Sequence, residues 1–198
     1  MYVLTVDQRD SRSGDDHVPA LLDDLNRRTP SDGLLRGFER TAGDEVQGVL
    51  TSPDAVMAVA VDLLRREQWN VGLGIGAVQE PLPPSTRAGR GEAFTYARDA
   101  VTRAKRGPHH VAVTGSDAGQ AESVETVLSL VAFVLARRTA GGWELIDLLQ
   151  AGHSRGEAAH RLGITESAVA QRLRAAGWTE QQRAQRLAGR LLAEEESS

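Results

Sequence analysis

The spacing of hydrophobic and polar positions changes several times along this chain, and each change marks an expected element. Residues 2–6, YVLTV, are rich in β-favouring residues and predict a buried strand that ends at Asp7. Between residues 16 and 28 the apolar positions recur at helical spacing, which predicts a helix. Two short β-favouring runs, LRGFERT and EVQGVLT, then flank Ala42-Gly43-Asp44 and predict a hairpin with its turn at these residues.

Helix and strand patterns continue to alternate as far as residue 138. Ser52-Pro53 favours a helix to about residue 66, because serine caps a helix and proline is tolerated in its first turn. WNVGLGIGAV, at 69–78, predicts a strand whose glycines allow another backbone to come close. Helices are expected at about 92–105 and 120–138, with a strand at 110–114 between them. The order predicts an α+β sheet, antiparallel or mixed, with helices on one face.

A new amphipathic pattern begins after the Thr-Ala-Gly-Gly stretch at 139–142, so we expect a first domain at 1–142 and a second, all-helical domain at 143–198. The chain has 23 basic and 27 acidic residues, which excludes a protein that is basic all over. Between His153 and Arg190, however, seven arginines face three glutamates. Any nucleic-acid surface is therefore expected in this segment.

The sequence also indicates a cellular compartment. It contains no cysteine, which excludes disulfides and thiolate metal sites. The opening residues lack the pattern of a secretory signal, and the longest uncharged apolar stretch, 126–136, is shorter than the roughly 20 residues that span a bilayer. We therefore expect a soluble, cytoplasmic protein with no membrane partner.

The segment at 154–176 carries the most specific local signals. Ser154 and Glu157 have the spacing of a capping box, which predicts a helix start. Gly163 supplies a turn, and Thr165 can cap a second helix, in which Val169 would lie on the buried side. The residues expected to contact DNA are Ser154, Thr165, Ser167, Ala168, Gln171, Arg172 and Arg174. Glutamine can pair with adenine, and arginine with guanine or phosphate.

This segment resembles the helix-turn-helix of sigma-factor region four and of many bacterial regulators, whose GIS-x-x-x-V-x-x-x-L core is matched here by GITESAVAQRL. The resemblance implies that the helix at 166–176 enters the major groove of double-stranded DNA, while the helix before it crosses the backbone. A homodimer is expected, because one recognition helix rarely specifies a site alone. A helix after Trp178 carries leucines at helical spacing and would pack on this hairpin or pair with its copy. The alternative is a helical hairpin that touches no nucleic acid.

The order of elements in the first part resembles the palm fold of class III nucleotidyl cyclases and diguanylate cyclases. That resemblance implies that Asp7 and Asp44 hold Mg²⁺ beside a nucleotide. Thr95 and Asp99, however, stand where those cyclases have an Asn and an Arg, so we do not expect catalysis. An aspartate at a strand end or in a turn also has a structural role, because it accepts hydrogen bonds from nearby N–H groups.

Other candidate ligand groups are Arg87 and Arg90, which stand in the loop PPSTRAGRGEA and could bind an anion. His109 and His110 are expected to point to opposite faces of a strand and to lie on the surface. Neither the arginine pair nor the histidine pair favours a metal site.

Taken over most of its length, the chain resembles the SatD-like bacterial proteins, through VDQRDSR, GDEVQGVL and GEAFTYAR. Our hypothesis is a cytoplasmic, dimeric DNA-binding transcriptional regulator, whose first domain is a catalytically degenerate cyclase-like sensor. It needs no cofactor, although Mg²⁺ or a small nucleotide could act as effector. The alternatives are a Mg²⁺-dependent nucleotide-processing enzyme and a protein-interaction adaptor.

Overall fold

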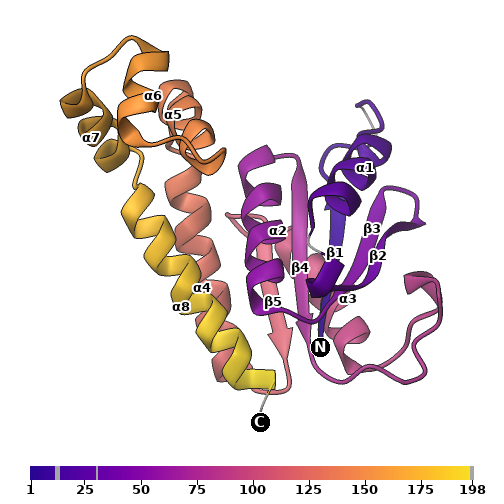
Figure 1. The fold of residues 1–198 in the computed structure, drawn as a ribbon. Helices are drawn as coiled ribbons and strands as arrows, with labels where there is room; N and C mark the ends of the chain where they lie inside the picture. The colour runs from indigo at the N-terminus through magenta and orange to yellow at the C-terminus, as the bar shows by residue number, and fades with distance from the viewer. Residues whose placement is uncertain (12–13, 30, 197–198) are drawn as a thin grey trace.

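The computed structural model describes residues 1–11, 14–29 and 31–196, and contains a five-stranded sheet covered by helices (Figure 1). The strands are β1 (Tyr2–Gln8), β2 (Leu34–Ala42), β3 (Glu45–Leu50), β4 (Trp69–Ile75) and β5 (Val111–Gly115). The α-helices are α1 (Val18–Arg28), α2 (Pro53–Arg66), α3 (Glu92–Ala104), α4 (Ala118–Leu135), α5 (Ala140–Gln150), α6 (Arg155–Leu162), α7 (Glu166–Ala175) and α8 (Trp178–Glu196). Two single-turn 3₁₀ helices, η1 (Ser31–Gly33) and η2 (Thr86–Ala88), complete the described elements.

The sheet is mixed, with strand order β2-β3-β1-β4-β5. β1 lies in its centre and pairs antiparallel with β3 and with β4, and β4 pairs in parallel with the edge strand β5. The expected α+β class with a mixed sheet is confirmed. The hairpin between β2 and β3 also forms as predicted, and Gly43 in its turn has a positive φ of 52°.

Helices cover both faces of the sheet, so the expectation of helices on one face is wrong. Alternate residues of β1 point in opposite directions: Leu4 lies in the large core with α1, α2 and α4, whereas Val3 packs with Phe94 of α3. The glycines of β4 explain why α3 fits so closely. A Cβ on Gly72 or on Gly74 would lie 2.3 or 2.1 Å from a backbone atom of α3. The sequence indicated a close approach here but not which element makes it.

The helices α5, α6 and α7 share a second, smaller core. Leu145 and Ile146 of α5, Ala158 of α6, and Val169 and Leu173 of α7 are buried in it. This cluster lies at one end of the long α4–α8 pair (Figure 1).

The last helix, α8, turns away from this cluster and runs back along α4 (Figure 1). Ala188 and Leu192 are fully buried in the large core, and the Tyr2 hydroxyl donates a hydrogen bond to the Leu192 carbonyl oxygen at 3.0 Å. We expected α8 to pack on the hairpin before it or to pair with its copy, but most of its packing is against α4. The predicted division at residue 142 stays a prediction, but α8 belongs by its packing to the first region.

Among the described helices, α4 alone is long and apolar enough to cross a membrane by length and composition. Its inner residues Val124, Leu128 and Val131 are buried in the large core. Only this inner face is packed in such a way, since a third of the 18 residues of α4 is buried.

Candidate functional site

The α6–α7 hairpin has the local geometry that the sequence predicted. The Ser154 side chain accepts a hydrogen bond from the Glu157 backbone N–H, and the Glu157 carboxylate accepts one from the Ser154 N–H, so the capping box is formed. Gly163 ends α6 with φ 62°, a conformation that favours glycine. Thr165 then caps α7 by accepting from the Ala168 N–H at 3.1 Å.

The two sides of α7 differ in exposure. Val169 and Leu173 are buried in the small core, whereas Ser167, Gln171 and Arg174 are exposed. The capping residues Ser154 and Thr165 are exposed as well, and Ala168 is half-buried. We call the surface formed by Ser167, Gln171 and Arg174 the α7 face.

Arg172, which we also expected to contact DNA, is less exposed than these three residues. It is half-buried, and its guanidinium lies beside Gly141 at the start of α5. Position 172 precedes buried Leu173 by one residue, which on a helix places it beside the buried side rather than opposite it.

Glu166 stands at the start of α7, next to α6. Its carboxylate lies beside Gly156 in the first turn of α6. The N-terminal end of a helix carries a partial positive charge, so this acid is stabilised where it stands.

A buried arginine ties the end of α7 to α4 and α8. Arg138 follows α4 and donates two hydrogen bonds to the Ala176 carbonyl oxygen, at 2.9 and 3.0 Å, and one to Gln181 Oε1 at 2.7 Å. Its guanidinium also lies 4.3 Å from the ring centre of Trp143. Burial lowers the pKa of Arg138 to about 10, so it stays charged at neutral pH.

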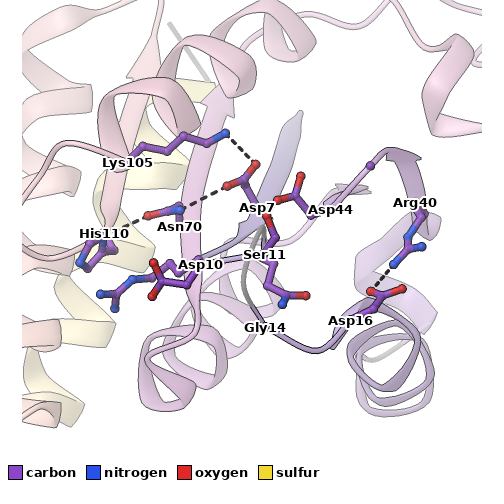
Figure 2. Close-up of a pocket in the computed structure, with 13 residues that line it drawn as sticks. Asp7, Asp10, Ser11, Gly14, Asp16, Arg40, Asp44, Asn70, Lys105 and His110 are labelled. Carbon is purple, nitrogen blue, oxygen red and sulfur yellow. Dashed lines mark hydrogen bonds and ion pairs between the residues drawn. The ribbon is translucent and has the colours of Figure 1, made fainter.

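The second candidate site is a polar cleft of about 900 Å³, where β1 ends, β4 begins and the β2–β3 hairpin turns (Figure 2). Asp7 and Asp44 both line it, although 36 residues separate them in sequence. Arg40 stands at its rim in an ion pair with Asp16, and this contact holds the pKa of the Asp16 carboxyl below its ordinary value. The structure therefore brings together the two acids that the sequence singled out.

The Asp7 carboxylate belongs to a chain of polar contacts that the sequence did not predict and that runs from Lys105 to His110 (Figure 2). Lys105 Nζ lies 2.7 Å from Asp7 Oδ2, and Asn70 Nδ2 donates to Asp7 Oδ1 at 3.3 Å. His110 Nδ1 in turn lies 3.0 Å from Asn70 Oδ1, and because a carbonyl oxygen only accepts, the histidine is the donor. Asp7 and Asn70 are both buried.

His110 corrects our expectation of a surface residue on a strand. β5 begins only at Val111, and His110 precedes it with φ 54°, which turns its ring into the cleft. Burial, followed by the nearby charges of Arg9 and His109, lowers the pKa of His110 below its usual value. Its imidazole is therefore neutral at pH 7, which agrees with its role as an Nδ1 donor.

Two signals in the sequence could have pointed to this cleft. Lys105 is the only lysine in the sequence, whereas the other 22 basic residues are arginines. Asn70 stands inside an otherwise apolar strand, where a buried polar group needs a partner.

A resident Mg²⁺ does not fit this cleft well. The Asp7 carboxylate is already occupied by an ammonium and an amide group. Among the described residues no group of three His, Asp or Glu side chains is arranged to hold a metal ion.

The other candidate ligand residues lie elsewhere. Arg87 and Arg90 are exposed on the loop that follows β4, at the end of this strand away from the cleft, and neither lines it. Asp99 is also remote, because it accepts a hydrogen bond from Thr114, near the end of β5 that is farther from His110. Arg12, in the motif VDQRDSR, is outside the described residues.

Comparison with known proteins gives a family. The model of the SatD family matches residues 5–192, which is nearly the whole chain and includes the cleft and the α6–α7 hairpin. No curated protein and no solved structure matches the chain. The chain therefore belongs to the SatD family.

Proposed function

We propose that this protein is a sequence-specific DNA-binding transcriptional regulator that reads DNA through α7. The observation that carries the proposal is the division of this helix. Val169 and Leu173 anchor it to a core. The side chains of Ser167, Gln171 and Arg174 project from the other side and make no hydrogen bond or ion pair with the described residues. A helix held in this way can enter a major groove while its polar side chains reach base edges.

The chemistry of the α7 face suits this task. Gln171 can bond the edge of adenine with both ends of its amide, and Arg174 can bond guanine or a phosphate. The hydroxyls of Ser154 and Thr165 each accept a backbone N–H, so their O–H groups remain available to donate to phosphate oxygens. We assign Arg172 no base contact, because it is half-buried against α5.

In this proposal the first region is a cyclase-like sensor without catalysis. Its support is that Asp7 and Asp44 meet in one cleft, as the resemblance to cyclases implies. Thr95 and Asp99, which replace the Asn and Arg of cyclases, lie on α3 and do not line the cleft. The cleft is the place for a small polar effector, a nucleotide among the candidates, whose binding would shift the population of DNA-competent molecules.

The test is selection of genomic DNA fragments by the purified full-length protein over a series of salt concentrations. Non-specific complexes dissociate as salt rises, whereas a specific subset of fragments should remain bound. Equal recovery of all fragments at low salt and none at moderate salt would overturn the proposal.

Variants then locate the contact on the selected fragment. Gln171→Ala and Arg174→Ala should each weaken binding by about 1 to 3 kcal/mol, because each removes one base contact. Arg98→Ala is the matched control, since Arg98 is an exposed arginine on α3, on the far side of the sheet from the main core. Equal losses for Arg98→Ala and Arg174→Ala would contradict recognition by α7.

The effector role has its own test. ATP and GTP, each with and without Mg²⁺, should raise the melting temperature of the wild type if they bind the cleft. Asp44→Ala should change that shift, whereas Asp23→Ala, at an exposed aspartate on α1, should not. The absence of any shift removes nucleotides as effectors and leaves DNA binding to be judged by the selection experiment.

A further inference from the structure

The outer face of α4 carries an exposed apolar stripe. Leu130 is 60% exposed and Phe133 is 42% exposed, and among the described residues only Leu187 joins them as an exposed large hydrophobic side chain. Thr126 precedes these two on the same side of the helix, one turn away. Neighbouring apolar side chains on a stable helix are typical of an interaction surface.

The stripe has opposite charges at its two ends. Glu122 stands one turn before Thr126, and Arg137 stands one turn after Phe133, so the exposed series runs at spacings of three and four residues. Neither end charge has an ion pair in the described part of the chain. The Arg137 guanidinium instead lies over the Phe133 ring, 3.4 Å from its centre.

This pattern is complementary to itself when reversed. If two α4 helices lie antiparallel about a two-fold axis between Ser129 and Leu130, Glu122 faces Arg137 of the second copy, and Thr126 faces its Phe133. The two members of each pair, 122 and 137, 126 and 133, and 129 and 130, lie equally far from this axis along the helix. An isologous interface requires this kind of match, because one patch must serve both partners.

The surface also offers a place for the apolar side chains. A groove of about 490 Å³ lies beside the stripe, between α4 and the turn before β5, where Pro108 and His109 form its far wall. Phe133 forms part of the near wall, with its ring edge-on to His109 at 6.2 Å. Leu130 of a second copy would fill a groove of this kind, so the stripe supplies both the projecting group and its receptor.

We propose that a second copy of this chain binds here, through antiparallel contact of the two α4 helices. The proposal does not rest on DNA binding, because its evidence and its test concern the association of the protein alone. If α7 does bind DNA, such a pair would carry two copies of it, related by the same two-fold axis.

Sedimentation equilibrium of the full-length protein over a range of concentrations tests the proposal. The wild type should approach twice the 21.3 kDa mass of one chain. Leu130→Asp should sediment as a monomer with unchanged circular dichroism, because the side chain is mostly exposed in the single chain. A wild type that stays monomeric up to millimolar concentration would overturn the proposal, as would a Leu130→Asp protein that remains dimeric.

Charge reversal tests the antiparallel arrangement separately. Glu122→Arg and Arg137→Glu should each weaken the dimer by placing like charges opposite one another, and the double variant should restore it. Asp23→Arg, an exposed charge reversal on α1, is the control and should leave the dimer unchanged. Failure of the double variant to recover, with both single variants weakened, would overturn the antiparallel pairing.

Discussion

The cleft and the α7 face are both polar surfaces, but their side chains are engaged differently. In the cleft, Lys105, Asp7, Asn70 and His110 bond to one another, so each is largely satisfied within the protein. On the α7 face the helix is fixed from beneath, and its outward groups remain available. A polar cluster whose members bond to one another can be a stable part of the fold, whereas the exposed polar groups of α7 can bond to water or to a partner.

The two regions also differ in what supports them. The cleft is built at the end of a sheet whose core includes residues from β1 to α8, whereas α7 depends on the small core of α5, α6 and α7. A perturbation should therefore remain local around α7 and spread through the molecule around the sheet.

The largest loss of stability is expected when a buried leucine is truncated, and its location should distinguish the two cores. Leu145→Ala in the small core and Leu73→Ala in the large core should each destabilise by about 2 to 5 kcal/mol, because both side chains are fully buried. Hydrogen exchange should show lost protection in α5, α6 and α7 only for Leu145→Ala, and throughout the sheet for Leu73→Ala. Equal loss over the whole chain in both variants would show that the cores unfold together.

The second-largest loss of stability is expected at Arg138, which joins the two regions. Arg138→Met should destabilise by about 1.5 to 3 kcal/mol, because it removes charged hydrogen bonds and leaves the Ala176 and Gln181 oxygens without their donor. The midpoint of urea denaturation measures the loss, and Arg98→Met, at an exposed arginine on α3, serves as the control. A stability equal to that of the control would mean that water replaces the arginine without penalty.

A smaller effect is expected in the cleft. Lys105→Met should destabilise by about 1 kcal/mol or less, because the lysine is about half exposed and solvent screens its ion pair with Asp7. Lys105→Arg should retain most of the stability, since the charge is kept. Thermal melting at low and high salt measures both variants, and a loss in Lys105→Met well above this range would indicate that Asp7 is more isolated from water than its contacts suggest.

The smallest effect is the pH dependence of His110. Because burial lowers its pKa in the folded protein, the unfolded chain binds a proton there first as the pH falls below 6.5. The free energy of unfolding should therefore decrease as the pH falls through this range, and His110→Gln should remove that part of the decrease. Melting curves between neutral and mildly acidic pH test this, and an unchanged slope in His110→Gln would assign the dependence to other groups.

Much of the local structure follows from the sequence alone. The Ser154 capping box, the Gly163 turn and the Thr165 cap depend on residues a few positions apart, and all three form as predicted. The buried positions of α7 follow from helical spacing in the same way. Geometry of this kind depends on residues that are close in sequence, so it can be predicted without the tertiary structure.

Tertiary structure decided what depends on residues that are distant in sequence. Asn70 comes from β4, whereas Lys105 and His110 come from the connection between α3 and β5, and no spacing rule relates them to Asp7. The docking of α3 on the second face of the sheet, the return of α8 along α4 and the withdrawal of Arg172 from the α7 face are of the same kind. Periodicity shows which side of an element is buried, but only packing selects the element that buries it.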